Sequence, residues 1–495
     1  MGDEQPALLM STTGLVAMTG YLILLVVLGL LGAKAKKEAS LADFYLSGRR
    51  MGLVVLVFTL YATQYSGNTL VGFAAKAYRS GFFFLVSVPF MMGVVGMYLI
   101  YAPRLRALSE KRGYITLSDF IHDRFGNRTL TTLVALSGII AMANYIISNL
   151  KAVGFTFAAA TGGAIGEAEG IILFAIIVLI YETLGGLRSV AWTDVAQGGV
   201  LFIGCVVIFS TILQSFGGLG AAMAEVQATR PDFWAPPTGA DIWLWVSTLL
   251  VVSIGIAIYP HAIQRIYAAG SAQSLRRAFQ IMVFLPLLTT LFMILVGILG
   301  TARFPDLDAT GSESVTLRML QALVADAPGT QWIVVLFITA VLAAIMSTVD
   351  SALLSISSML TQDLFRPLRP DLDQASLTQF GKRVSWVVMA LAVFLAIVLG
   401  ESIWGLIEIK LELLMQIAPA LFLGLHWRRL GAPAALGGFL VGTGLTLFFS
   451  AGSNFLEAIP KKPLGIHSGL IGLAGNLLTL AVIQFASRGR ERAVG

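Results

Sequence analysis

The sequence is poor in the residues that water-soluble proteins and their common catalytic sites depend on. Only 12% of its 495 residues are charged and 57% are hydrophobic, whereas a soluble domain carries about 25% charged residues. Such a chain cannot cover its surface with charge, which excludes a water-soluble protein. A single cysteine, Cys205, excludes an intramolecular disulfide, and four scattered histidines give no metal-ligand spacing.

Apolar segments recur along the whole chain. About 20 apolar residues span the hydrocarbon core of a bilayer, and about thirteen segments approach that length. The sequence therefore predicts an all-α integral membrane protein with about 13 transmembrane helices. The predicted segments are 13–33, 51–79, 82–102, 130–159, 165–185, 190–214, 242–266, 278–300, 331–361, 384–400, 403–425, 434–451 and 467–486.

The distribution of charge orients these segments. Acidic residues precede the first segment and basic residues follow it, the reverse of a cleaved signal peptide, so we expect a retained helix with its N-terminus outside. Most of the 33 lysines and arginines then fall in cytoplasmic segments, as the positive-inside rule requires. We expect a multi-pass protein of the plasma (inner) membrane with a cytoplasmic C-terminus. This bias explains the net charge of +6 without a nucleic-acid partner.

Two predicted segments are interrupted by residues that do not favour a continuous helix. Residues 62–69 of the second segment are mostly small or polar, and the seventh segment carries Ser253, Gly255, Pro260 and His261. Unwound backbone at membrane depth is tolerated only where it lines a buried or water-filled cavity. Interrupted helices in corresponding, oppositely oriented positions indicate a transporter binding site, although two ordinary kinks would leave the same pattern.

Four sequence motifs accompany these breaks. They are residues 43–50 (DFYLSGRR), 62–67 (ATQYSG), 185–194 (GGLRSVAWTD) and 343–351 (AAIMSTVDS). Together they closely resemble the sodium/solute symporter family, which includes importers of proline, pantothenate, sialic acid and sugars. The resemblance implies a five-plus-five inverted-repeat, leucine-transporter-like core with two broken helices.

The same resemblance divides the chain. We expect an extra N-terminal helix and a cytoplasmic loop over 1–50, and the first inverted repeat over 51–215. The second repeat is expected over 216–426, followed by two C-terminal helices and a short basic tail over 427–495.

The resemblance also implies a sodium site at the first break. Its ligands would be the carbonyl oxygens of Ala62, Tyr65 and Ala344 and the hydroxyls of Ser347 and Thr348. Sodium is a hard cation that prefers oxygen ligands, and a broken helix frees carbonyl groups. The alternative is that Ser347 and Thr348 only hydrogen-bond to their own helix, as membrane serines often do.

Buried carboxylates suggest a second ion site. Some family members hold a second sodium ion at positions matching Asp194, Asp350 and Ser351. Here a carboxylate stands at one position where the family has a hydroxyl, so the site could bind sodium or the two acids could share a proton. In the alternative, Asp194 lies at the inner interface and pairs with Arg188.

The solute is expected beside the break in the second segment. Lys151 could receive a carboxylate there, or it could snorkel to the interface or pair with a membrane acid. Glu408, Lys410 and Glu412 lie in the eleventh segment, and the sequence leaves their roles open. The candidate contacts are Gln64, Ser66, Asn68, Tyr145, Asn149, Lys151, Tyr259 and Gln264.

These features favour a sodium-coupled symporter that imports a small organic solute by alternating access, using one sodium ion or two. The solute is expected to be a monocarboxylate, a pantothenate-like acid or an amino acid. An anion carried with one sodium ion moves no net charge, so it gains nothing from the membrane potential, which supplies about 2.3 kcal/mol per charge at 100 mV. An anionic solute therefore favours coupling to at least two sodium ions.

Other classes of protein fit less well. A membrane sensor would need a separate signalling partner, and no obligate protein partner is evident. An enzyme is not expected, because the chain has no nucleophile elbow, His-Glu metal cluster or phosphate loop. A channel would not need a site that couples ion and solute. Counterflow exchange in vesicles distinguishes a carrier from a channel.

Removing both hydroxyls of the main sodium site tests the assignment. Ser347→Ala combined with Thr348→Ala should abolish sodium-stimulated uptake and leave expression intact, because two of the ion's oxygen ligands are lost. Unchanged sodium dependence of uptake in vesicles would contradict the site.

Overall fold

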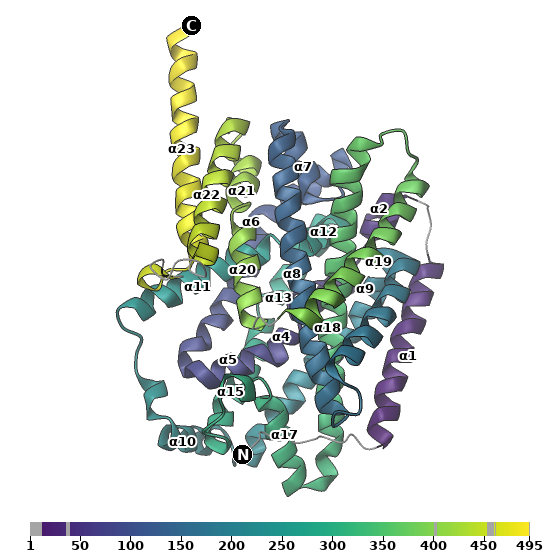
Figure 1. Cartoon of the computed structure of the whole chain (residues 1–495), viewed down its shortest axis with the longest axis vertical. Helices are drawn as coiled ribbons and strands as arrows, with labels where there is room; N and C mark the ends of the chain where they lie inside the picture. Colours follow the sequence, from purple (N-terminus) through teal and green to yellow (C-terminus); the bar gives the residue numbers. More distant parts are fainter. Residues whose placement is uncertain (1–11, 36–39, 400–402, 453–459, 461, 495) are drawn as a thin grey trace.

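The computed structural model describes residues 12–35, 40–399, 403–452, 460 and 462–494 of an all-α protein. Within these ranges the only pairing of β type is an isolated bridge between Met51 and Ala269. Ten helices in the described residues are long and apolar enough to cross a membrane. Most run roughly along the long axis of the molecule in Figure 1, with α1 at one edge and α22 and α23 at the other. The predicted fold class is therefore confirmed.

The first half of the chain builds the helices around the first break. Short 3₁₀ turns lie at Ser47–Arg49 and Gly81–Val86. The α-helices are α1 (Thr12–Lys34), α2 (Leu41–Leu46), α3 (Leu53–Gln64), α4 (Gly67–Leu70), α5 (Gly72–Ser80), α6 (Ser87–Arg112), α7 (Leu117–Phe125), α8 (Arg128–Ala160), α9 (Glu167–Ser215) and α10 (Leu219–Thr229).

The second half of the chain contains the second break and the C-terminal helices. A π-helical turn at Leu360–Phe365 extends α18. The α-helices are α11 (Ala240–Ala257), α12 (Pro260–Ala268), α13 (Ala272–Met282), α14 (Leu285–Leu288), α15 (Thr290–Arg303), α16 (Ala309–Ser312), α17 (Val315–Asp326), α18 (Gln331–Met359), α19 (Gln374–Val398), α20 (Ile403–Met415), α21 (Ala418–His426), α22 (Ala432–Gly452) and α23 (Ser468–Val494), with further 3₁₀ turns at Pro231–Trp234, Pro328–Thr330, Arg366–Leu368 and Pro463–Gly465.

The ten long helices do not match the thirteen predicted segments one to one. Helix α9 contains two predicted segments, 165–185 and 190–214, on either side of a kink at Gly186. The predicted segments 51–79 and 403–425 are divided among shorter helices. The number of membrane crossings therefore remains a prediction.

The kink in α9 folds its two halves alongside α18. Gly186 has φ +57° and ψ −147°, a backbone conformation open to glycine alone. Before the kink Tyr181 contacts Asp350, and after it Asp194 contacts Ser347. In a straight helix Tyr181 and Asp194 would stand about 20 Å apart, so the two halves lie side by side against the site.

Both predicted breaks are present. Helix α3 ends at Gln64 and the chain resumes as α4 at Gly67, while α11 ends at Ala257 and α12 begins at Pro260. The two broken helices are joined at one end of the bundle. The amide of Met51 donates to the carbonyl of Ala268 (3.1 Å), and the amide of Gly270 donates to the carbonyl of Met51 (2.9 Å).

A substitution at the kink tests this packing. Gly186→Ala should destabilise the protein by about 2 kcal/mol or more, because alanine does not tolerate this backbone conformation and its Cβ would overlap the carbonyl oxygen of Phe44. Gly199→Ala on the same helix is the control, since a Cβ there meets nothing within 4 Å. Melting temperatures in detergent measure both effects, and an equal response of the two variants would contradict this account.

Candidate functional site

The break in α3 exposes backbone oxygen atoms in the middle of the protein. Tyr65 leaves the helix with φ −102° and ψ 102°. The last carbonyl groups of a helix have no partner within that helix, and Ala62 lies in this last turn. Tyr65 and Ala62 are both buried, so water does not replace the missing partners from the surface.

The broken helix faces the predicted hydroxyl residues of α18. A Cβ added at Gly67 would overlap the side chain of Ile345, so the start of α4 lies directly on α18. The Tyr145 hydroxyl on α8 lies near both Ser66 and Thr348. The structure thus brings the break together with the 344–348 stretch.

The oxygen atoms at this junction fit a sodium ion. Ser347 and Thr348 are fully buried. Ser347 donates its hydroxyl hydrogen to Asp194 (2.6 Å), and Thr348 donates to the carbonyl of Ala344 (2.9 Å). The hydrogen bond of Thr348 lies within its own helix, as the alternative reading of these hydroxyls proposed. A hydroxyl that donates its hydrogen nevertheless keeps its oxygen lone pairs for a cation. Neutral hydroxyl and carbonyl oxygens are the ligand type that hard cations prefer.

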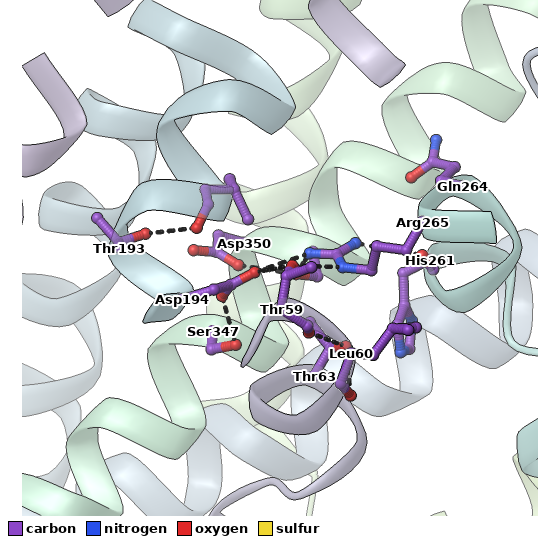
Figure 2. A network of polar contacts seen from close by, with 12 residues as sticks. Thr59, Leu60, Thr63, Thr193, Asp194, His261, Gln264, Arg265, Ser347 and Asp350 are labelled. Carbon is purple, nitrogen blue, oxygen red and sulfur yellow. Dashed lines mark hydrogen bonds and ion pairs between the residues drawn. The ribbon is translucent and has the colours of Figure 1, made fainter. Parts of the chain in front are cut away.

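Asp194 is the centre of a buried polar network behind the hydroxyls (Figure 2). Its Oδ1 accepts from Ser347, and its Oδ2 accepts from the hydroxyl of Thr59 on α3 and from the guanidinium of Arg265 on α12 (3.3 Å). Arg265 also donates through Nε to Thr59 (3.0 Å) and through Nη1 to the carbonyl of His261 (3.2 Å). Asp194 and Arg265 are both fully buried.

Asp350 joins the network one step further from the guanidinium. Its Oδ2 accepts from the hydroxyl of Tyr181 (2.7 Å) and its Oδ1 from Ser351 (3.0 Å). Ser351 in turn accepts from Nη2 of Arg265 (2.5 Å). The structure therefore brings Asp194, Asp350 and Ser351 together, with the side chain of Arg265 among them.

The alternative in which Asp194 pairs with Arg188 is wrong. Arg188 forms an ion pair with Asp43 on α2 (2.6 Å) instead. Sequence analysis did not identify Arg265 as the partner of Asp194. The available signal was a basic residue inside a predicted membrane segment, five positions after Pro260.

A small cavity of about 40 Å³ lies beside the break. Four predicted solute contacts line it: Gln64, Ser66, Tyr145 and Tyr259. Lys410 of α20, whose role the sequence left open, also lines it. Its remaining walls are mostly apolar and come from α4, α5, α6, α11 and α20; they are Thr69, Phe73, Phe90, Met91, Val252, Ile256 and Leu411.

Three other predicted contacts, Gln264, Lys151 and Asn149, do not line this cavity. Gln264 is held between Ser355 and Ser358 by two hydrogen bonds of 2.7 Å. The ammonium of Lys151 donates to the carbonyl of Leu399 at the end of α19. Asn149 donates to the carbonyl of Tyr145 in its own helix, and the side chain of Asn68 lies outside the described residues.

Two broken helices, with buried hydroxyl residues next to one of the breaks, define an ion-coupled secondary transporter with a five-plus-five inverted-repeat core. The chain belongs to the sodium:solute symporter family, whose model matches residues 44–442. The predicted family and sodium-coupled solute import are thereby confirmed.

Three known proteins illustrate the likeness. The chain is 28% identical to the high-affinity proline transporter PutP of Bacillus subtilis, over 93% of this chain and 95% of that protein. It is 26% identical to the sodium/pantothenate symporter of Haemophilus influenzae, over 89% and 91%. The solved structure of a sodium-coupled sialic acid symporter in an outward-open state matches with a TM-score of 0.80 at 21% identity, covering 96% of this chain and 97% of that one.

The buried ion pair makes a prediction about stability. Asp194→Asn should destabilise the protein by about 3–5 kcal/mol, because it leaves the guanidinium of Arg265 buried without a counterion. The double variant Asp194→Asn/Arg265→Gln should lose less than the sum of the two single variants. Unfolding free energies of the four proteins give the coupling, and strictly additive losses would contradict the pairing.

Proposed function

We propose that this protein imports a small organic solute together with one sodium ion across the plasma membrane. The observation that carries the proposal is the close contact between Gly67, just after the break in α3, and Ile345 of α18, next to the buried hydroxyls of Ser347 and Thr348. It supports a sodium site made by the carbonyls of Ala62, Tyr65 and Ala344 with the hydroxyls of Ser347 and Thr348. The solute would occupy the cavity on the other side of the break.

We infer that the solute reaches the cavity from one side of the bundle. A hollow of about 880 Å³ lies next to it, and both are lined by the same helix, α11. Leu244 and Thr248 of α11 line the hollow, whereas Val252 and Ile256, the next turns along the helix, line the cavity. In the orientation that the basic residues favour, this hollow faces the outside, and the junction of Met51 with α12 lies toward the inside.

The position of Arg265 favours a single coupled sodium ion. The guanidinium supplies a positive charge among Asp194, Asp350 and Ser351, where a second sodium ion was expected. The two oxygens of Asp194 already accept three hydrogen bonds. Two of these bonds come from neutral hydroxyls and one comes from Arg265. A second ion at Asp194 would have to displace a buried side chain that makes four hydrogen bonds.

Coupling to one ion limits how far a solute is concentrated. A neutral solute moving with one sodium ion gains the membrane potential, about 2.3 kcal/mol at 100 mV. A monoanion moving with one ion is electroneutral, and a tenfold sodium gradient then supplies only about 1.4 kcal/mol. If the solute is a monoanion, we propose that the sodium concentration gradient alone drives its uptake, so that it is concentrated less than a neutral solute would be.

Equilibrium binding of radioactive sodium to the purified protein tests the proposal without knowledge of the solute. We expect one saturable site per chain, lost in the Ser347→Ala/Thr348→Ala variant and retained in Thr193→Ala, whose hydroxyl bonds only within α9. Absence of saturable binding would overturn the sodium site. Two ions per chain would instead place the second ion at Asp350 and Ser351 and contradict the role given to Arg265.

A further inference from the structure

Lys410 is a buried lysine that lines the cavity beside the break. Its side chain on α20 is 1% exposed. The ammonium nitrogen lies 3.1 Å from the centroid of the Tyr145 ring and 5.3 Å from that of Tyr259. Aromatic faces attract cations, but they replace only part of the hydration that a buried ammonium loses.

No carboxylate of the described residues pairs with Lys410. The nearest acids in the sequence, two residues away on either side, have other partners. Glu408 pairs with Lys462 (2.8 Å), and Glu412 accepts from Ser468 (2.5 Å) and lies 3.3 Å from His467. None of the side chains that line the cavity is acidic. A buried lysine without an anionic partner is rare in proteins.

We propose that the solute itself supplies the missing anion. The cavity then binds a small monocarboxylate, whose carboxylate contacts the ammonium of Lys410. This inference rests on the proposed function and names the chemical class of its solute.

Gln64 adds a second recognition element. Its amide nitrogen and oxygen are buried and have no hydrogen-bond partner among the described residues. Buried amides are normally paired, so the solute is expected to bring a hydroxyl or keto group to Gln64. The apolar walls at Phe90, Val252 and Ile256 would cover a short hydrocarbon part.

The same geometry disfavours amino acids. The ammonium of a zwitterion would find no acidic side chain in this cavity and would be repelled by Lys410. Short hydroxy and keto monocarboxylates combine the required carboxylate with a group for Gln64, and the volume of the cavity favours small ones.

A thermal-shift and equilibrium-binding panel on the purified full-length protein tests the proposal. The probes are lactate and pyruvate, the neutral lactamide and the zwitterion alanine, each in sodium and in potassium. We expect sodium-dependent binding of the two acids and at least tenfold weaker binding of lactamide and alanine. Lys410→Met should weaken lactate binding by about tenfold to a hundredfold, as expected for loss of a hydrogen bond to a charged group.

Lys151→Met is the matched control, because it removes a second lysine whose ammonium bonds to Leu399 outside the cavity. Its lactate affinity should stay within about twofold of the parent protein. Stabilisation by sodium alone reports the ion site and the fold of each variant. If sodium stabilises the parent and Lys410→Met alike, but the acids do not bind or bind both equally, the role of Lys410 is overturned. If sodium has no effect on the parent, the proposed function fails first.

Discussion

The buried ion pair between Asp194 and Arg265 joins the elements on which the rest of the site depends. Asp194 lies on the second half of α9 and accepts hydrogen bonds from α3, α12 and α18. These include both broken helices and the helix that carries the proposed sodium ligands Ser347 and Thr348. A charge pair without access to water is stable only when its geometry is well defined and its hydrogen bonds are satisfied, so the pair constrains the relative positions of all four helices.

Ser347 connects this ion pair to the proposed sodium site. Its hydroxyl hydrogen is directed to Asp194, which leaves its oxygen lone pairs for the proposed ion. Thr59, which also donates to Asp194, lies on α3, one turn before Ala62. In our proposal, ion binding at the break therefore acts on the same contacts that join α3 to α9 and α12, and Tyr145 links the ion site to the solute cavity through Ser66 and Thr348.

The sequence predicted those parts of the site that depend on local chemistry alone, namely the two helix breaks. A run of small and polar residues at membrane depth identified the break at 62–69, and the proline identified the break before α12. The sequence did not predict the roles of Arg265 and Lys410, because these depend on which neighbour each helix face meets. It left the role of Lys410 open, and only the packing of α20 against α8 places this side chain over Tyr145. For Lys151 the sequence left the solute site, the interface and a membrane acid open as partners, and the structure directs it to the end of α19.

A density map of the protein in sodium is the most direct test of the central claim, which is that the broken α3 and α18 hold a single ion. The account predicts one ion coordinated by the backbone of Ala62, Tyr65 and Ala344 and by the hydroxyls of Ser347 and Thr348, with Arg265 still bonded to Asp194. An ion bound to Asp194 in place of the guanidinium, with no density at the break, would contradict it.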